Sequence, residues 1–123
     1  MYVADTGNNR IQVFSSNGTF MERWGRYGAI NGSFNNPENV AVDQTGNIYL
    51  ADTGNNRIQV FSSNGTFISA WGRYAIGDTG LRSPEGIAVD SSGNVFVADT
   101  NNNRILVLSR LPISNVTFSS LFQ

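Results

Sequence analysis

A long internal repeat constrains the fold of this chain more than any other feature. Residues 3–25 and 50–72 are identical at 19 of 23 positions, and a step of 47 residues relates them without a gap. A third copy begins near Ser83 and loses the pattern after Ser109. Because chance does not produce such a register, the sequence predicts a repeat architecture. The near-identity of the copies points to recent tandem duplication or to deliberate design, and the sequence leaves both open.

The repeated unit has the composition of a small antiparallel sheet. Its apolar runs are rich in β-branched and aromatic residues, are bounded by Gly, Asn, Asp or Ser, and lack a helical period. In the complete copy, these runs are residues 39–43, 47–52, 57–61 and 66–71. Four antiparallel strands repeated about every 40–50 residues are typical of a β-propeller blade. We therefore expect an all-β chain with a partial blade at residues 1–25, a full blade at 35–72 and a third blade at 83–121.

The repeated residues resemble the NHL repeat. Pro-Glu-x-Val/Ile-Ala-Val-Asp is followed by Gly-Asn-x-Tyr/Phe-x-Ala-Asp-Thr, Asn-Asn-Arg-Ile and Trp-Gly at residues 37–72, and again from Pro84 without the Trp-Gly. Residues 2–25 carry the latter part of a preceding copy, so the resemblance covers about two and three-quarter repeats. It implies a β-propeller, commonly of six blades. Relatives of this kind bind proteins, peptides or RNA, and a minority are lyases that act on amidated peptide precursors.

Three blades do not close a ring of six. The strands are apolar on both sides, which predicts that each blade packs between two neighbours. An uncovered blade face would exceed the few hundred Å² of apolar surface that monomers usually expose, and no polar cap is visible at Met1. We expect either a fragment of a longer protein or self-association of two copies into a six-bladed ring. In the second case, Ser114–Leu121 of a partner chain would supply the missing first strand.

The composition excludes several classes of function. The eight basic residues are all Arg, the net charge is −1, and the chain contains neither His nor Cys. The charge balance disfavours nucleic-acid binding, and the missing residue types remove the commonest general base, the commonest metal ligands and a Ser-His-Asp triad. The related lyases depend on a metal held by His. The sequence therefore predicts a protein that is not an enzyme and has no cofactor and no metal. No apolar run approaches the ~18 residues of a membrane span.

The Asp-Thr-Gly-Asn-Asn-Arg loop recurs in each copy and has two interpretations. Its carboxylates and guanidinium groups could bind an ion near the propeller channel. Alternatively, the Asp caps the loop backbone and pairs with the Arg. We favour the structural interpretation, because residues shared by every copy serve what every copy shares. The residues concerned are Asp5, Arg10, Asp52, Arg57, Asp99 and Arg104.

Two further repeated positions have competing interpretations. Asp43 and Asp90 follow the first strand of a blade, where they could bind Ca²⁺ but more often form turns. Trp24 and Trp71 end the outer strand, where they could stack on a ligand but more often pack between blades.

Residues that differ between the copies carry more information about binding. The two inter-blade linkers keep Arg-Tyr and then diverge, and loops on a rigid scaffold are where binding specificity tends to reside. We expect them to bind a protein or peptide. The alternatives are single-stranded RNA on an Arg/Tyr rim, a lyase remnant whose site lies in missing blades, and a linker that merely closes the blade. The candidate contacts are Arg26, Tyr27, Arg73, Tyr74 and Arg82.

Overall fold

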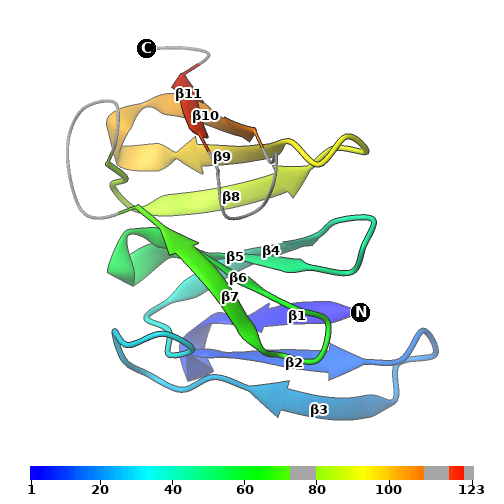
Figure 1. The fold of residues 1–123 in the computed structure, drawn as a ribbon. Coiled ribbons are helices and arrows are strands. Elements are labelled where there is room, and N and C mark those ends of the chain that lie inside the picture. Colours follow the sequence, from blue (N-terminus) through cyan, green and yellow to red (C-terminus); the bar gives the residue numbers. More distant parts are fainter. Residues whose placement is uncertain (73–79, 110–116, 121–123) are drawn as a thin grey trace.

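The fold consists of short β-strands joined by tight turns. The computed structural model describes residues 1–72, 80–109 and 117–120. Within these ranges every regular element is a strand or a short 3-10 turn (Figure 1). This confirms the all-β fold predicted from the repeat. In the described part of the chain, no helix has the length and apolar character needed to cross a membrane.

The strands form three antiparallel sheets in chain order. The first sheet contains β1 (Tyr2–Asp5), β2 (Arg10–Phe14) and β3 (Phe20–Trp24). The second contains β4 (Pro37–Val42), β5 (Ile48–Asp52), β6 (Arg57–Phe61) and β7 (Phe67–Trp71). The third contains β8 (Pro84–Val89), β9 (Val95–Asp99), β10 (Arg104–Ser109) and β11 (Thr117–Ser120). Figure 1 shows the three sheets stacked one on another, which is the arrangement of a partial propeller.

The third sheet contains a segment for which the sequence suggested a role in self-association. β11 pairs with β10 in antiparallel register, with Ser109 opposite Thr117 and Leu108 opposite Phe118. Within the chain, this segment is therefore the outermost strand of the third sheet, and pairing of the segment with a partner chain stays a prediction. The physical reason for the pairing with β10 is chain connectivity. Pairing with a strand that lies nearby in the sequence closes a short loop and costs little conformational entropy.

Two hydrophobic clusters hold the stack together, one at each sheet-to-sheet contact. Along β5, Ile48 and Leu50 join the cluster with the first sheet, whereas Tyr49 and Ala51 join the cluster with the third. All five residues of β5 are buried. Successive side chains of a strand point to opposite faces, so the middle sheet buries both of its faces, as its doubly apolar strands predict.

The repeated tryptophans lie in these clusters. The Trp24 ring centroid lies 5.1 Å from that of Phe61 in the next sheet. Trp71 packs against the cluster shared by the second and third sheets. Both side chains therefore pack between sheets, in agreement with the structural interpretation of this position.

A glycine after the outer strand lets each linker lie close to the sheet that it leaves. Gly25 has a φ of +102°, and a Cβ built there would lie 2.2 Å from the Phe34 ring. Gly72 has the same relation to Leu81, at 2.5 Å. A side chain at either position would displace the apolar residue that anchors the linker, which explains the Gly of the repeated Trp-Gly.

Candidate functional site

The repeated loops and the first linker lie along one edge of the stack, on the left in Figure 1. The loops contain the 3-10 turns η1 (Thr6–Asn8), η2 (Thr53–Asn55) and η3 (Thr100–Asn102). Strand direction alternates within each sheet, so the turn after the second strand and the linker after the fourth reach the same edge. Of the residues that we expected to bind a partner, those within the described part of the chain, Arg26, Tyr27 and Arg82, lie at this edge.

Each repeated loop contains an ion pair between its Asp and its Arg. The pairs join Arg10 Nε to Asp5 Oδ2 at 2.7 Å, Arg57 Nε to Asp52 Oδ2 at 2.7 Å, and Arg104 Nε to Asp99 Oδ2 at 2.9 Å. The Asp52 and Asp99 side chains have no exposed surface. In the first copy, hydrogen bonds from Asn8 and then from Arg10 lower the pKa of Asp5. These carboxylates are occupied by neighbours within their own sheets.

The second carboxylate oxygen reaches the linker instead of the loop. Asn35 donates its backbone N–H to Asp52 Oδ1 at 2.8 Å, and Arg82 donates its backbone N–H to Asp99 Oδ1 at 2.7 Å. None of the three Asp side chains caps its own 3-10 turn. The expectation of a local cap is therefore wrong, because the buried Asp instead accepts from the chain that enters its sheet.

The last Asn of each of the first two loops connects one sheet to the next. Asn9 and Asn56 adopt left-handed conformations, with φ of 54° and 55°. Asn36 donates its backbone N–H to Asn9 Oδ1 at 2.8 Å, and Ser83 does the same to Asn56 Oδ1 at 2.9 Å. Sequence reasoning missed this role. The only signal in the sequence is that this Asn, and the residue before the Pro that begins the next sheet, both recur with the step of 47 residues.

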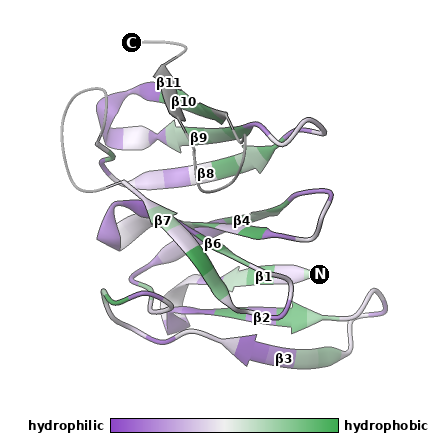
Figure 2. Cartoon of the chain, in the orientation of Figure 1, coloured by the Kyte–Doolittle hydropathy of each residue, from purple (hydrophilic) through white to green (hydrophobic). Residues whose placement is uncertain are grey.

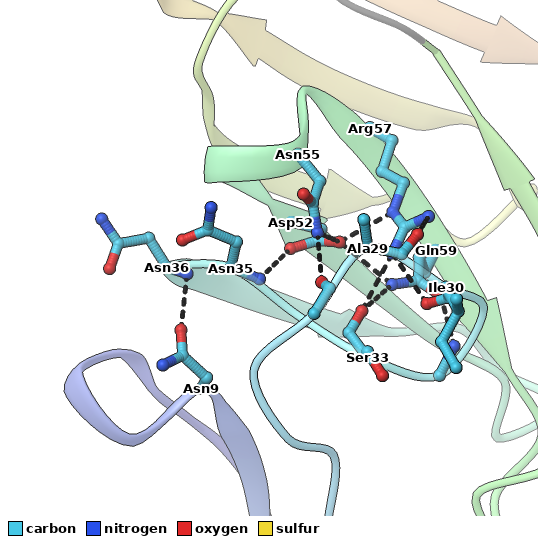
Figure 3. A network of polar contacts seen from close by, with 12 residues as sticks. Asn9, Ala29, Ile30, Ser33, Asn35, Asn36, Asp52, Asn55, Arg57 and Gln59 are labelled. Atoms are coloured by element: carbon cyan, nitrogen blue, oxygen red, sulfur yellow. Dashed lines mark hydrogen bonds and ion pairs between the residues drawn. The ribbon is translucent and has the colours of Figure 1, made fainter.

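The linker between the first two sheets is fixed by side chains of the second sheet, as Figure 3 shows. Arg57 donates from Nη1 to the Ala29 carbonyl at 2.8 Å, and from Nη2 to the carbonyls of Ile30 and Ser33 at 3.1 and 2.9 Å. Gln59 donates to the Ser33 carbonyl at 2.8 Å. Further bonds join Asn55 Nδ2 to the Gly28 carbonyl at 2.8 Å and the Gly32 N–H to Gln59 Oε1 at 3.0 Å.

The same linker exposes large side chains. Tyr27 is 69% exposed and Ile30 is 67% exposed, and Arg26 beside them is also exposed. The backbone beneath them is closed by a bond from the Phe34 N–H to the Arg26 carbonyl at 2.8 Å. A fixed backbone therefore presents an aromatic, an aliphatic and a cationic side chain. Sequence reasoning missed Ile30, whose signal is an apolar residue within a polar, copy-specific linker.

The remaining predicted rim residues have different surroundings. Arg82 lies on the linker that enters the third sheet. Its Nη1 lies 3.5 Å from the carbonyl of Asn101, a residue of η3 in that sheet's repeated loop. Arg26 and Tyr27 lie on the linker between the first two sheets, so the described candidates lie along one edge but on different linkers. Arg73 and Tyr74 lie outside the described residues.

The aspartates after the first strand form turns. Asp43 Oδ1 accepts from the backbone N–H groups of Thr45 and Asn47 at 2.9 and 3.0 Å, and Oδ2 accepts from the Tyr49 hydroxyl at 2.9 Å. Burial raises the pKa of Asp43, but the hydrogen bond from the Thr45 hydroxyl, together with those from the three groups above, outweighs it, and the net pKa is lowered. In Asp90, a backbone hydrogen bond from Asn94 is the main cause of a lowered pKa. Within residues 1–72, 80–109 and 117–120, no group of three acidic, His or Cys side chains is arranged to hold a metal.

Comparison with protein families identifies the repeated unit. A family model described as NHL repeat matches residues 34–61 and residues 81–108. These ranges include the second and third strands of the second and third sheets and the loops between those strands. A comparison with curated proteins gave no match.

Proposed function

We propose that this chain, in which residues 34–61 and 81–108 match the NHL repeat, is a non-catalytic propeller module that binds a protein or peptide through the linker between its first two sheets. The observation that carries the proposal is the contrast within that linker. Its backbone is fixed by Arg57, Gln59 and Asn55, whereas Tyr27 and Ile30 are more than two-thirds exposed.

A rigid loop with exposed apolar side chains suits recognition of another chain. Ordering a flexible loop on binding costs free energy, and a loop already held by hydrogen bonds avoids most of that cost. Tyr and Arg are among the residues that contribute most to protein interfaces. Arg26, Tyr27 and Ile30 together favour a segment that combines apolar and acidic side chains.

Two observations weigh against RNA as the ligand of this edge. The Arg57 guanidinium is bonded to Asp52 and to three linker carbonyls, and the Arg104 guanidinium is bonded to Asp99 and to the Gly80 carbonyl. These cations are therefore engaged within the fold, and the net charge is −1. Phosphate recognition depends on available positive charge.

The test is selection of peptides followed by comparison of variants. A random peptide library displayed on phage is selected against the chain, and the affinities of enriched peptides are measured by fluorescence anisotropy. We expect Tyr27→Ser to weaken binding by about tenfold or more, the loss expected for an interface anchor. Met21→Ser is the matched control, because Met21 is 61% exposed on β3.

The proposal is overturned if no peptide is enriched, or if the Tyr27 and Met21 variants bind equally well. Labelled single-stranded RNA is measured in parallel at two salt concentrations. Salt-dependent RNA binding that is lost with Arg26→Ala would favour the nucleic-acid alternative instead.

A further inference from the structure

The third sheet has one covered face and one open face. Val95, Val97, Leu106 and Leu108 have no exposed surface and belong to the cluster shared with the second sheet. The alternate residues of β9 and β10 form cross-strand pairs, Ile105 with Ala98 and Val107 with Phe96. These four are partly exposed and belong to neither buried cluster of the described residues. The open face is apolar and contains a shallow depression of about 220 Å³, lined by Gly86, Ile87, Ala88, Phe96, Ala98 and Ile105.

The repeat shows what covers this kind of face. One step of 47 residues earlier, the same positions in the second sheet are Tyr49, Ala51, Ile58 and Val60. All four are at most 1% exposed, because the third sheet packs on them. The cover of this face is thus the opposite face of another repeat sheet.

The face of the first sheet that points away from the second sheet is the matching face, and no other sheet of the described residues covers it. Val3, Phe14 and Phe20 correspond to Leu50, Phe61 and Phe67, which pack against the first sheet. Val3 is 39% exposed and Phe20 is 46% exposed, whereas Leu50 and Phe61 are at most 1% exposed. The Phe14 and Phe20 rings already form an edge-to-face pair with centroids 6.0 Å apart, like the 5.8 Å pair of Phe61 and Phe67. Both ends of the stack appear in Figure 2.

We propose that the open face of the third sheet binds the open face of the first sheet in a second copy of this chain. Faces of these two kinds already pack against each other twice within the chain, once between the first and second sheets and once between the second and third. Each interface would be head to tail, and two copies close into a ring by making it twice. Large contiguous apolar faces are otherwise uncommon on isolated proteins.

The experiment measures molar mass in solution by size exclusion with light scattering. We expect the wild-type chain to be a dimer that dissociates on dilution. Ile105→Glu places a charge on the open face of the third sheet, and Phe20→Glu does the same on the first. Each variant alone should be a monomer, since it lacks one of the two faces.

Mixing the two variants separates head-to-tail binding from other arrangements. The Ile105→Glu chain keeps an intact first sheet, and the Phe20→Glu chain keeps an intact third sheet. A mixture should therefore form a one-to-one complex, weaker than the wild-type dimer because it has one interface in place of two. If like faces met, one variant would still form a dimer alone and mixing would restore nothing, and the proposal would be wrong.

Controls keep the result independent of folding and of the proposed peptide site. Val107→Glu is a second variant on the same face, and circular dichroism establishes that each variant is folded. Ile30→Glu changes an exposed residue of the linker and should leave the mass unchanged while weakening peptide binding. A wild-type chain that is monomeric at every concentration, or that forms open polymers, overturns the proposal and leaves the peptide-binding test unaffected.

Discussion

At the scale of single residues, the three copies provide matched experiments within one chain. Asp52 and Asp5 accept the same set of bonds on Oδ2, from an Asn, an Arg and a Gln. They differ in exposure, because the Asp52 side chain is fully buried and that of Asp5 is 22% exposed. The same substitution at the two sites therefore compares a buried Asp, which also accepts the Asn35 N–H of the linker, with a partly exposed one.

We predict that Asp52→Asn destabilises the chain by about 3–5 kcal/mol, because it leaves the Arg57 guanidinium buried without its counter-charge. Asp5→Asn should cost much less, because water solvates the exposed pair. Urea unfolding followed by circular dichroism measures both free energies of unfolding. Equal losses for the two variants would contradict the role assigned to burial.

Acid should destabilise the turn that follows β4, the first strand of the second sheet, where Asp43 lies. Asp43 has a pKa below its ordinary value of 3.8 in the folded chain, so the folded state favours the carboxylate. Stability from this group is present above the unfolded pKa and is lost as the pH falls through the folded pKa. We predict that the free energy of unfolding falls below about pH 5, and that Asp43→Asn makes this fall shallower. Parallel curves for the variant and the wild type would refute this assignment.

The sequence indicates which residues are structural but not all of their partners. The Asp–Arg pair is foreseeable because the two residues are close in sequence and opposite in charge. The bond from the Asn35 N–H to Asp52 is not, because 17 residues separate the groups and the linker path decides whether they meet. Ile30 was missed for a related reason, since only the folded linker shows that its side chain faces solvent.

At the scale of elements, one arginine bonds to the linker at three carbonyls. Arg57 donates to Asp52 and to three linker carbonyls, so it connects η2 and β6 to the preceding connection. The rim loop is therefore positioned by the sheet that follows it. Strand positions are well predicted from the sequence, with the full copy differing from expectation mainly in that β4 begins at Pro37, a residue tolerated at the start of a strand.

We predict that Arg57→Lys loosens the linker without unfolding the sheets. Lys retains the charge but lacks the planar fork that reaches several carbonyls at once. Losing two or more hydrogen bonds of about 0.5–1.5 kcal/mol each should lower hydrogen-exchange protection around residues 28–34 by about tenfold or more. Arg10→Lys is the control, and unchanged exchange in the linker of the Arg57 variant would contradict this role.

At the scale of the whole molecule, stability depends on contact between sheets. Ile11, Ile58 and Ile105 occupy the same position in the three copies, yet the first two are fully buried and the third is partly exposed. The difference arises from the position of each sheet in the stack, which no local sequence pattern encodes. The sequence predicted a third blade at residues 83–121 but did not specify the pairing of β11 with β10, since the repeat pattern fades before that strand.

We predict that Ile58→Ala costs about 2–5 kcal/mol, as is usual for emptying a packed core. Ile105→Ala should cost clearly less at low protein concentration. Urea denaturation of dilute samples makes the comparison, and Ile11→Ala should resemble Ile58→Ala. A loss at Ile105 as large as that at Ile58 would mean that the third sheet is already covered within one chain.

The identity of β2 and β6, which share the residues Arg-Ile-Gln-Val-Phe, has a consequence for refolding. A chain that exchanges the two strands keeps several cross-strand neighbours of the same type, such as the Asp opposite the Arg and the Trp opposite the Ile. Other neighbours change, since Gln12 faces Val3 and Arg23 whereas Gln59 faces Leu50 and Ala70, so pairing energy distinguishes the two isomers only through these positions. Both strands carry the Arg and the Gln that bind the linker carbonyls, so these bonds do not distinguish the isomers either. Misassembly between copies is a known hazard of tandem arrays, and in this chain the few neighbours that differ between the copies are what oppose it.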